Sequence, residues 1–220
     1  MRIVATSDTH SVVDVSKIPD GDVFIHAGDL MTTGYPDDFK KQLTWLKKLP
    51  HKVKLYVPGN HDFHLQVYPG PALQELRSIG VWVLGLPGNV NYVDYELPNG
   101  MHVMGLPFVT ELPRWAFNMG DTSVWKYIKN LPSAVKKADI VVSHAPPFTY
   151  LDKTLTGKHG GVYAYQSLFE AGEFPNVKHW ISGHVHEAYG TLEKNGCTFH
   201  NVALSDRAYK HSNTPLVLDL

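Results

Sequence analysis

Leu55-Tyr56-Val57-Pro58-Gly59-Asn60-His61-Asp62 joins an apolar run to three polar side chains through a Pro-Gly turn. A short apolar run that ends at a turn indicates a buried strand. The polar side chains then lie just beyond the carboxyl end of that strand, where ligands bind in open α/β folds. Gly-Asn is also ordinary turn chemistry, so this stretch alone leaves a plain surface turn open as an alternative.

Four other predicted strands also end in a polar cluster. They span residues 3–6, 22–27, 139–143 and 178–182, and the clusters that follow them contain Asp8 and His10, Asp29, His144, and His184 with His186. Any one cluster has a structural explanation as a turn or a cap. Five clusters at one sheet edge bring oxygen and imidazole ligands together, which predicts a site for divalent cations such as Mn, Fe or Zn.

Amphipathic helices are predicted between the strands. Phe39, Leu43 and Leu46 recur at helical spacing, and the predicted helices span residues 36–49, 71–79, 122–131 and 162–170. Further strands are predicted at residues 81–84, 91–97, 102–106 and 215–220, and loops at 110–121 and 151–161. Strands that alternate with helices in this way predict an α/β layered fold, which we expect to form one domain over residues 1–220.

Composition narrows the function classes. The formal net charge is −1 and the pI is near 6.9, whereas domains that grip long nucleic acids usually carry a basic excess. Cys197 is the single cysteine, so no internal disulfide can form and a reducing, cytoplasmic location is expected. No apolar run approaches the length that spans a bilayer, so we expect no membrane partner.

The order of the clusters, D-x-H, G-D, G-N-H-D, H and G-H-x-H, resembles the calcineurin-like metallophosphoesterase superfamily from Asp8 to His186. The flanking segments resemble one branch of it, the class III cyclic-nucleotide or MPPED-type metallophosphodiesterases. Those segments are residues 7–11, 18–23, 144–147 and 186–191.

This resemblance implies a four-layer α/β/β/α sandwich with two mixed β-sheets and a dinuclear metal site. Mn²⁺ is the expected metal, with Fe, Zn, Ni and Mg as alternatives. The implied ligands are Asp8, His10, Asp29 and His186 for one ion, and Asp29, Asn60, His144 and His184 for the other. Asp29 would bridge them, because a carboxylate has two oxygens.

The resemblance also implies the catalytic roles. A hydroxide between the ions would attack phosphorus, His61 would contact phosphate and protonate the leaving oxygen, and Asp62 would orient the His61 ring. His64, Lys158 and His159 are candidate substrate contacts. Trp115 and Phe117 could stack a nucleobase or pack in the core.

The expected substrate is a small phosphodiester, with cyclic nucleotides the leading class, acted on by a monomer or a homodimer. A nuclease and a phosphoprotein phosphatase are alternatives with the same metals, and the near-neutral charge disfavours the nuclease. A metal-free interaction scaffold is the alternative outside enzymes. That alternative predicts missing ligands, yet every ligand position is filled here, including His184.

Overall fold

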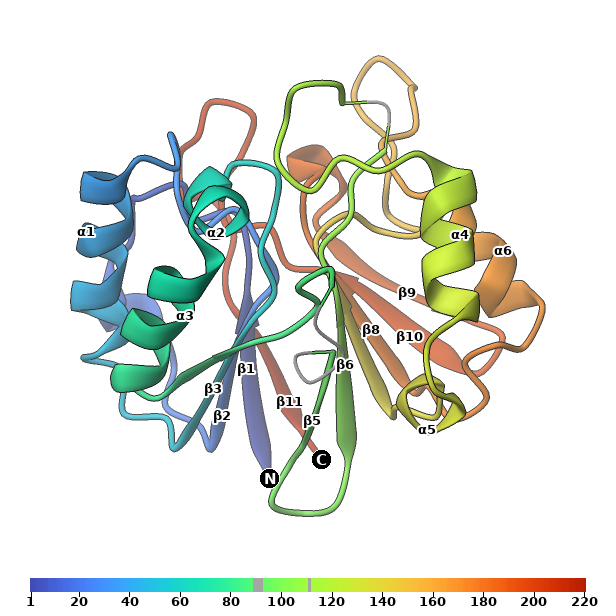
Figure 1. The fold of residues 1–220 in the computed structure, drawn as a ribbon, viewed down its shortest axis with the longest axis horizontal. Helices are drawn as coiled ribbons and strands as arrows, with labels where there is room; N and C mark the ends of the chain where they lie inside the picture. The colour runs from blue at the N-terminus through green and yellow to red at the C-terminus, as the bar shows by residue number, and fades with distance from the viewer. Residues whose placement is uncertain (89–92, 111) are drawn as a thin grey trace.

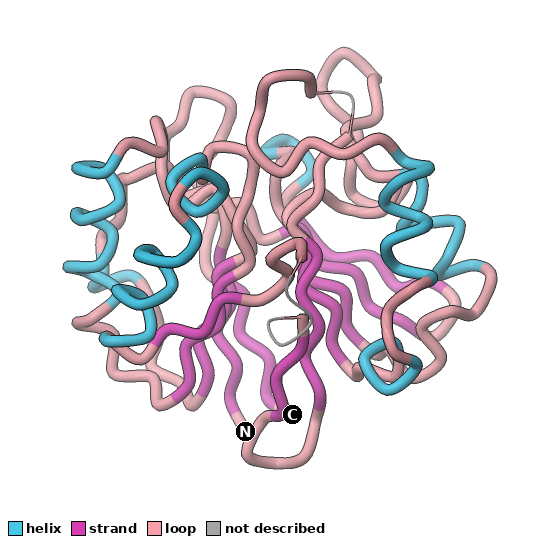
Figure 2. The backbone as a smooth tube through the Cα atoms, in the orientation of Figure 1, coloured by secondary structure: helices cyan, strands magenta, loops and turns pink. Residues whose placement is uncertain are grey.

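Two β-sheets pack face to face, and helices cover the outer face of each sheet (Figure 1). This arrangement is a computed structural model that describes residues 1–88, 93–110 and 112–220. Figure 2 shows the resulting order of layers, helix, strand, strand and helix. The predicted α/β/β/α sandwich with two mixed sheets is therefore confirmed.

The first sheet has the strand order β11-β1-β2-β3-β4. Strands β1 to β4 run parallel, and β11 pairs antiparallel with β1. Their bounds are β1 Arg2–Thr6, β2 Val23–His26, β3 Val53–Tyr56, β4 Val81–Val83 and β11 Leu216–Asp219. The helices on this side are α1 Pro36–Leu46, α2 Phe63–Val67 and α3 Pro69–Ser78.

The second sheet has the order β5-β6-β7-β8-β10-β9. Its four central strands run parallel, and the edge strands β5 and β9 are antiparallel to their neighbours. The bounds are β5 Asp94–Glu96, β6 His102–Leu106, β7 Ile140–Ser143, β8 His179–Ser182, β9 Gly190–Lys194 and β10 Cys197–Asn201. Its helices are α4 Asp121–Lys129, α5 Ser133–Lys136 and α6 Tyr163–Glu170.

Alternation along the strands divides the apolar side chains among three cores. Successive residues of a strand point to opposite faces, so Ile3 and Ala5 of β1 join the core between the sheets, whereas Val4 faces the α1 side. In the second sheet, Val141 of β7 faces the α4 and α6 side. Both faces of the parallel strands are therefore buried, which explains their nearly continuous apolar sequences.

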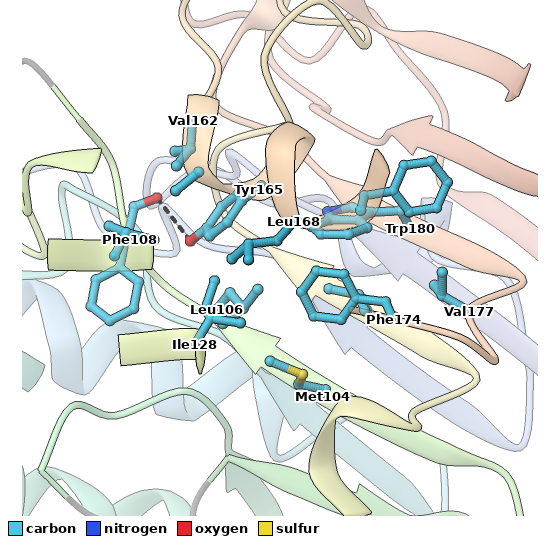
Figure 3. Packing of buried hydrophobic residues seen from close by; sticks show 14 of the residues in the cluster. Met104, Leu106, Phe108, Ile128, Val162, Tyr165, Leu168, Phe174, Val177 and Trp180 are labelled. Atoms are coloured by element: carbon cyan, nitrogen blue, oxygen red, sulfur yellow. Dashed lines mark hydrogen bonds between the residues drawn. The ribbon is translucent and has the colours of Figure 1, made fainter. Parts of the chain in front are cut away.

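The core under α4 and α6 fixes the strands that deliver the second half of the site (Figure 3). Tyr165 donates its hydroxyl to the Phe108 carbonyl at 3.4 Å. Trp180 of β8 is fully buried, and its indole nitrogen donates to the Ser143 hydroxyl at 2.8 Å. Ser143 is the last residue of β7, so this bond sets the exit of the chain toward His144.

Several boundaries differ from the sequence expectation. The short helices α2 and α5 were not predicted, because five and four residues are too few to show a helical period. Strand β5 covers only part of the predicted segment 91–97, of which residues 91–92 lie outside the described part of the chain. The loop predicted at 110–121 is present except that α4 already begins at Asp121, and residue 111 is likewise not described. Within the described ranges, no helix is long and apolar enough to cross a membrane.

Candidate metal centre

The carboxyl ends of five strands from both sheets meet at one place. Asp8 and His10 follow β1, Asp29 follows β2, Asn60 follows β3, His144 follows β7, and His184 and His186 follow β8. The two sheets are joined there by the backbone, because the Ser7 amide donates to the Val202 carbonyl at 3.0 Å. The structure thus brings together all seven residues predicted as ligands.

Asp8, His10 and His186 form the first donor group, with one ligand atom from each within 4.8 Å of the others. The Nε2 atoms of His10 and His186 are 3.2 Å apart. His186 Nε2 also lies 3.3 Å from Asp8 Oδ1. Three donor atoms thus face one common point.

Asp29, His144 and His184 form the second donor group within the same 4.8 Å limit. His144 Nε2 lies 3.3 Å from Asp29 Oδ2 and 3.0 Å from Asn60 Oδ1. The amide oxygen of Asn60 is therefore positioned as a neutral fourth donor to this group.

Asp29 belongs to both neighbourhoods, and it does so through one oxygen. Its Oδ2 is 3.3 Å from His144 Nε2 and 4.0 Å from His10 Nε2. Its Oδ1 accepts the backbone N–H of His61 at 2.8 Å. Asp29 thus has an oxygen near both donor groups, and its role as a bridge between two ions stays a prediction.

Hydrogen bonds to carbonyls set the tautomers of two imidazoles. His144 Nδ1 donates to the Ala27 carbonyl at 3.0 Å, and His186 Nδ1 donates to the Asp206 carbonyl at 2.9 Å. A carbonyl can only accept, so each neutral ring presents its Nε2 lone pair to the donor group. Metal-binding histidines are held in this manner, and the residues present fit divalent cations.

The electrostatics of the centre also favour a cation. Burial raises the pKa of the Asp8 carboxyl, but His186 and His144 outweigh burial and hold that pKa below its usual range. Asp29 is held low in the same way, chiefly by His144. Burial lowers the pKa of His144 and His186, yet the two carboxylates outweigh it and raise each to about 9. The two buried carboxylates thus stabilise positive charge in the site.

The backbone is strained where it presents the donors. Asp8, His10, Asp29 and His184 have φ values of 53°, 44°, 53° and 66°, a left-handed region that non-glycine residues rarely adopt. Such strain costs about 1–3 kcal/mol per residue and persists only where the surroundings enforce it. Close packing supplies that enforcement: a Cβ on Gly59 would lie 2.4 Å from Asp29 Oδ1.

His61 lies half buried beside the first donor group, with its ring centroid 4.7 Å from that of His10. Its Nδ1 is 2.7 Å from the Thr32 carbonyl and donates to it. The opposite nitrogen, Nε2, is therefore the one free to act on a substrate.

Asp62 does not orient the His61 ring, contrary to the expectation, because the Thr32 carbonyl occupies Nδ1. The buried Asp62 carboxylate instead accepts backbone N–H groups of Gly59 at 2.7 Å and Met31 at 3.0 Å. Burial and the charge of Asp29 raise the Asp62 pKa to about 6. Asp62 thus ties the turn after β3 to the loop after β2.

The three candidate substrate contacts lie apart from the donors. His64 is buried in α2 and stacks on Phe39 at 4.4 Å between centroids. His159 Nδ1 is 2.7 Å from Asp152 Oδ1, and Lys158 is exposed on the same loop. The structure does not bring these three side chains into the pocket at the donors.

The two aromatic candidates have different positions. Phe117 is buried in the core on the α1 side, which favours the packing alternative. Trp115 is 39% exposed, with its ring centroid 4.5 Å from that of His61. Trp115 therefore lies against the predicted proton donor.

A pocket of about 200 Å³ opens over the donors. Besides His61 and five of the seven predicted ligands, it is lined by Glu187, Arg207 and Tyr209. Sequence reasoning missed the last two residues because they lie in an irregular loop before β11. Ser-Asp-Arg at 205–207 is the usable signal there, since aspartate and serine favour turns that present a neighbouring side chain.

A sequence model of the calcineurin-like phosphoesterase family matches residues 1–188. Metallophosphoesterase domain-containing protein 1 of Homo sapiens is 31% identical over an alignment of 235 positions, covering 100% of this chain and 71% of that protein. A UPF0046 protein of Caenorhabditis elegans is 28% identical, covering 100% of this chain and 81% of that protein.

The fold has a counterpart among solved structures. A dimetal phosphatase from Danio rerio superposes with a TM-score of 0.53 at 11% identity, covering 91% of this chain and 86% of that one. This likeness concerns the fold, while the family follows from the sequence matches. The chain belongs to the calcineurin-like phosphoesterase family of metal-dependent phosphoesterases.

Proposed function

We propose that this protein hydrolyses small phosphodiesters, with cyclic nucleotides as the leading substrate class. The observation that carries the proposal is the pair of donor groups that share Asp29 Oδ2 beside His61 and Trp115. A site of this kind suits in-line displacement at phosphorus. The oxygen and imidazole donors suit Mn²⁺, with Fe, Zn, Ni or Mg as alternatives.

When bound, two cations supply a nucleophile by lowering the pKa of water, and they offset charge on the phosphoryl oxygens. The chain itself positions that chemistry. Asp29 places Oδ2 near both donor groups. Its Oδ1 accepts the backbone N–H of His61 and so fixes the position of that residue. The loop that carries the proton donor and the residue that joins the donor groups are therefore linked by one hydrogen bond.

His61 is proposed to protonate the leaving oxygen from Nε2. Its Nδ1 proton is committed to the Thr32 carbonyl, so the protonated ring has its transferable proton on the side of the pocket. General acid catalysis of this kind contributes most where the leaving group is a poor one, such as an alkoxide.

Trp115 supports a substrate with an aromatic leaving part. The indole lies next to His61, the residue proposed to protonate the leaving oxygen, and is partly open to solvent. Stacking on a nucleobase would use this surface. The formal net charge of −1 provides no general attraction for a long nucleic acid, so a small nucleotide is the better match.

The test is a substrate panel with Mn²⁺-loaded protein. A bis-aryl diester, 2′,3′- and 3′,5′-cyclic nucleotides, single-stranded DNA and a phosphopeptide are compared, with Asp29→Asn as the inactive control. We expect hydrolysis of the diesters and cyclic nucleotides. Fast phosphopeptide turnover without diester cleavage would establish the phosphatase alternative. Processive cleavage of DNA would establish the nuclease alternative.

The oligomeric state and the cellular location are also part of this proposal. The protein would act as a monomer or homodimer in the cytoplasm, consistent with a single cysteine, Cys197, that is buried in the core. A protein purified without chelators that holds no metal and shows no metal-stimulated turnover would instead indicate the scaffold.

A further inference from the structure

The loop between β10 and β11 is attached to the metal centre at three points. Ser205 Oγ donates to the Asp8 carbonyl at 2.6 Å, and the Asp206 carbonyl accepts from His186 Nδ1 at 2.9 Å. Further along, His211 Nε2 donates to the Thr9 carbonyl at 3.1 Å. The loop is therefore held against the backbone that carries the first donor group.

Asp206 also fixes the internal shape of this loop. Its Oδ1 accepts the backbone N–H groups of Ala208 at 2.8 Å and Lys210 at 3.1 Å. Its carbonyl accepts the Tyr209 N–H at 2.9 Å. Arg207 lies inside this turn, so its Cα has a defined position although its side chain is exposed.

The contacts of Tyr209 show that this turn faces the first donor group. Its ring meets the ring of His10 edge to face at 4.7 Å between centroids, and the ring of His186 at 5.5 Å. Its φ of 57° is a strained value that the turn enforces. Tyr209 and Arg207 both line the pocket over the donors, at a ring distance of 6.5 Å between Tyr209 and His61.

Arg207 is the permanent cation among the residues that line this pocket. The other charged side chains there are Asp29 and Glu187, together with the histidines. Across the described ranges, the Arg207 guanidinium forms no hydrogen bond or ion pair. An arginine at the rim of an anion-hydrolysing pocket thus keeps all of its donors available.

We propose that Arg207 binds the non-bridging oxygens of the substrate phosphate. Tyr209, which packs against His10 and His186, holds the loop that carries Arg207 in place. The planar guanidinium can donate two parallel hydrogen bonds to phosphate. This role rests on the proposed function for the identity of the substrate, but it concerns the phosphate group alone. Arg207 would thus contact the phosphate from the solvent side of the pocket, while the metal ligands lie at its base.

The experiment measures binding of inorganic phosphate to the Mn²⁺-loaded protein by calorimetry. Arg207→Ala is expected to weaken binding about tenfold, and Arg207→Lys about threefold, because lysine keeps the charge but loses the fork. Lys210→Ala is the matched control, since it removes one positive charge from the same loop at a residue that does not line the pocket. Its affinity should stay within about twofold of wild type.

Metal content and melting temperature are measured for every variant, so that a disturbed loop is recognised. Equal phosphate affinity in wild type, Arg207→Ala and Lys210→Ala would overturn the inference, as would equal weakening in both alanine variants. If phosphate binding depends on Arg207 but no phosphodiester is turned over, the assignment of Arg207 stands and the proposed function fails. If diesters are turned over with an unchanged KM in Arg207→Ala, only the assignment of Arg207 fails.

Discussion

His10 and His186 face each other with their Nε2 atoms 3.2 Å apart. The Asp206 carbonyl accepts the Nδ1 proton of His186, so Nε2 is the atom that His186 presents at this contact. Among the described residues, the buried His10 Nδ1 has no hydrogen-bond partner, whereas His10 Nε2 lies within 4.0 Å of His186 Nε2, Asp8 Oδ1 and Asp29 Oδ2. A cation that binds both Nε2 atoms would replace this contact between two imidazoles.

We therefore expect His186→Ala to lower the bound metal from about two ions per chain to about one. The proposed diesterase activity should fall by about 100-fold or more, because a ligand is lost outright. Elemental analysis of protein loaded with Mn²⁺ measures the first effect. His102→Ala is the control, since His102 begins β6 at the opposite edge of the sheet. Full metal content in His186→Ala would contradict the ligand assignment.

His61→Ala tests the proton donor. Activity on diesters with an alkoxide leaving group should fall by about 10²–10⁴-fold, whereas diesters of nitrophenol, which leave without a proton, should be affected far less. The ligand atoms of His61, His10 and Asp29 also lie within 4.8 Å of one another, but neither proposed ligand set includes His61, so metal content should not change. Rates across a series of leaving groups measure this dependence. Undiminished activity on the alkoxide substrates, with metal intact, would rule out the role.

Trp115→Ala tests the stacking surface. For a cyclic nucleotide, KM should rise about tenfold, since base stacking on an aromatic ring contributes about 1–3 kcal/mol. For methyl 4-nitrophenyl phosphate, which has no base, KM should stay within about twofold. Trp125→Ala is a matched control, because Trp125 is similarly exposed on α4 and lines a different pocket together with Tyr163. Equal effects on both substrates would show that Trp115 acts through structure.

The sequence sufficed for those parts of the site that follow directly from a strand. Asn60, for example, comes four residues after the end of β3, and strand order alone carries it to the common edge. Arg207 could not be placed in this way, because its position depends on bonds from Ser205 and Asp206 to residues almost 200 or 20 positions away. Tertiary contacts of an irregular loop leave no period in the sequence.

Proximity in sequence to His61 predicted the position of a side chain less well than the end of a strand did. Asp62 follows His61 directly, yet its carboxylate turns inward to backbone amides, since a buried carboxylate needs several donors. His64 is two residues further on, and the unpredicted helix α2 turns it toward Phe39. The layered fold, in contrast, was predictable because apolar strands and amphipathic helices have clear periods.

Gly183→Ala tests the close approach of β8 to β1. An added Cβ would lie 2.0 Å from Ser7 Oγ and 2.2 Å from Asp8 Oδ2, so either the chain or the Asp8 carboxylate must move. We expect a loss of about 3 kcal/mol in the free energy of unfolding and reduced metal content. Urea unfolding of the metal-free protein separates the two effects. Gly70→Ala, where nothing lies within 4 Å, is the control and should be neutral or stabilising. Equal stability of the two variants would contradict this packing.

His200 provides a pH dependence of stability away from the metal centre. Burial, followed by the neighbouring His179, lowers the His200 pKa from its ordinary 6.5 to about 4. The unfolded chain therefore binds a proton between these values that the folded chain does not, so stability is present above pH 6.5 and is lost as the pH falls toward 4.

For this one group the loss between pH 7 and pH 5 is about 2 kcal/mol. His200→Gln should remove it, so the variant should lose less unfolding free energy than wild type over this range, whatever its stability at pH 7. Urea unfolding at both pH values measures the difference. His102→Gln, which replaces a partly exposed imidazole, should keep the wild-type slope. A His200→Gln variant with the wild-type slope would show that His200 does not stay neutral in the folded protein.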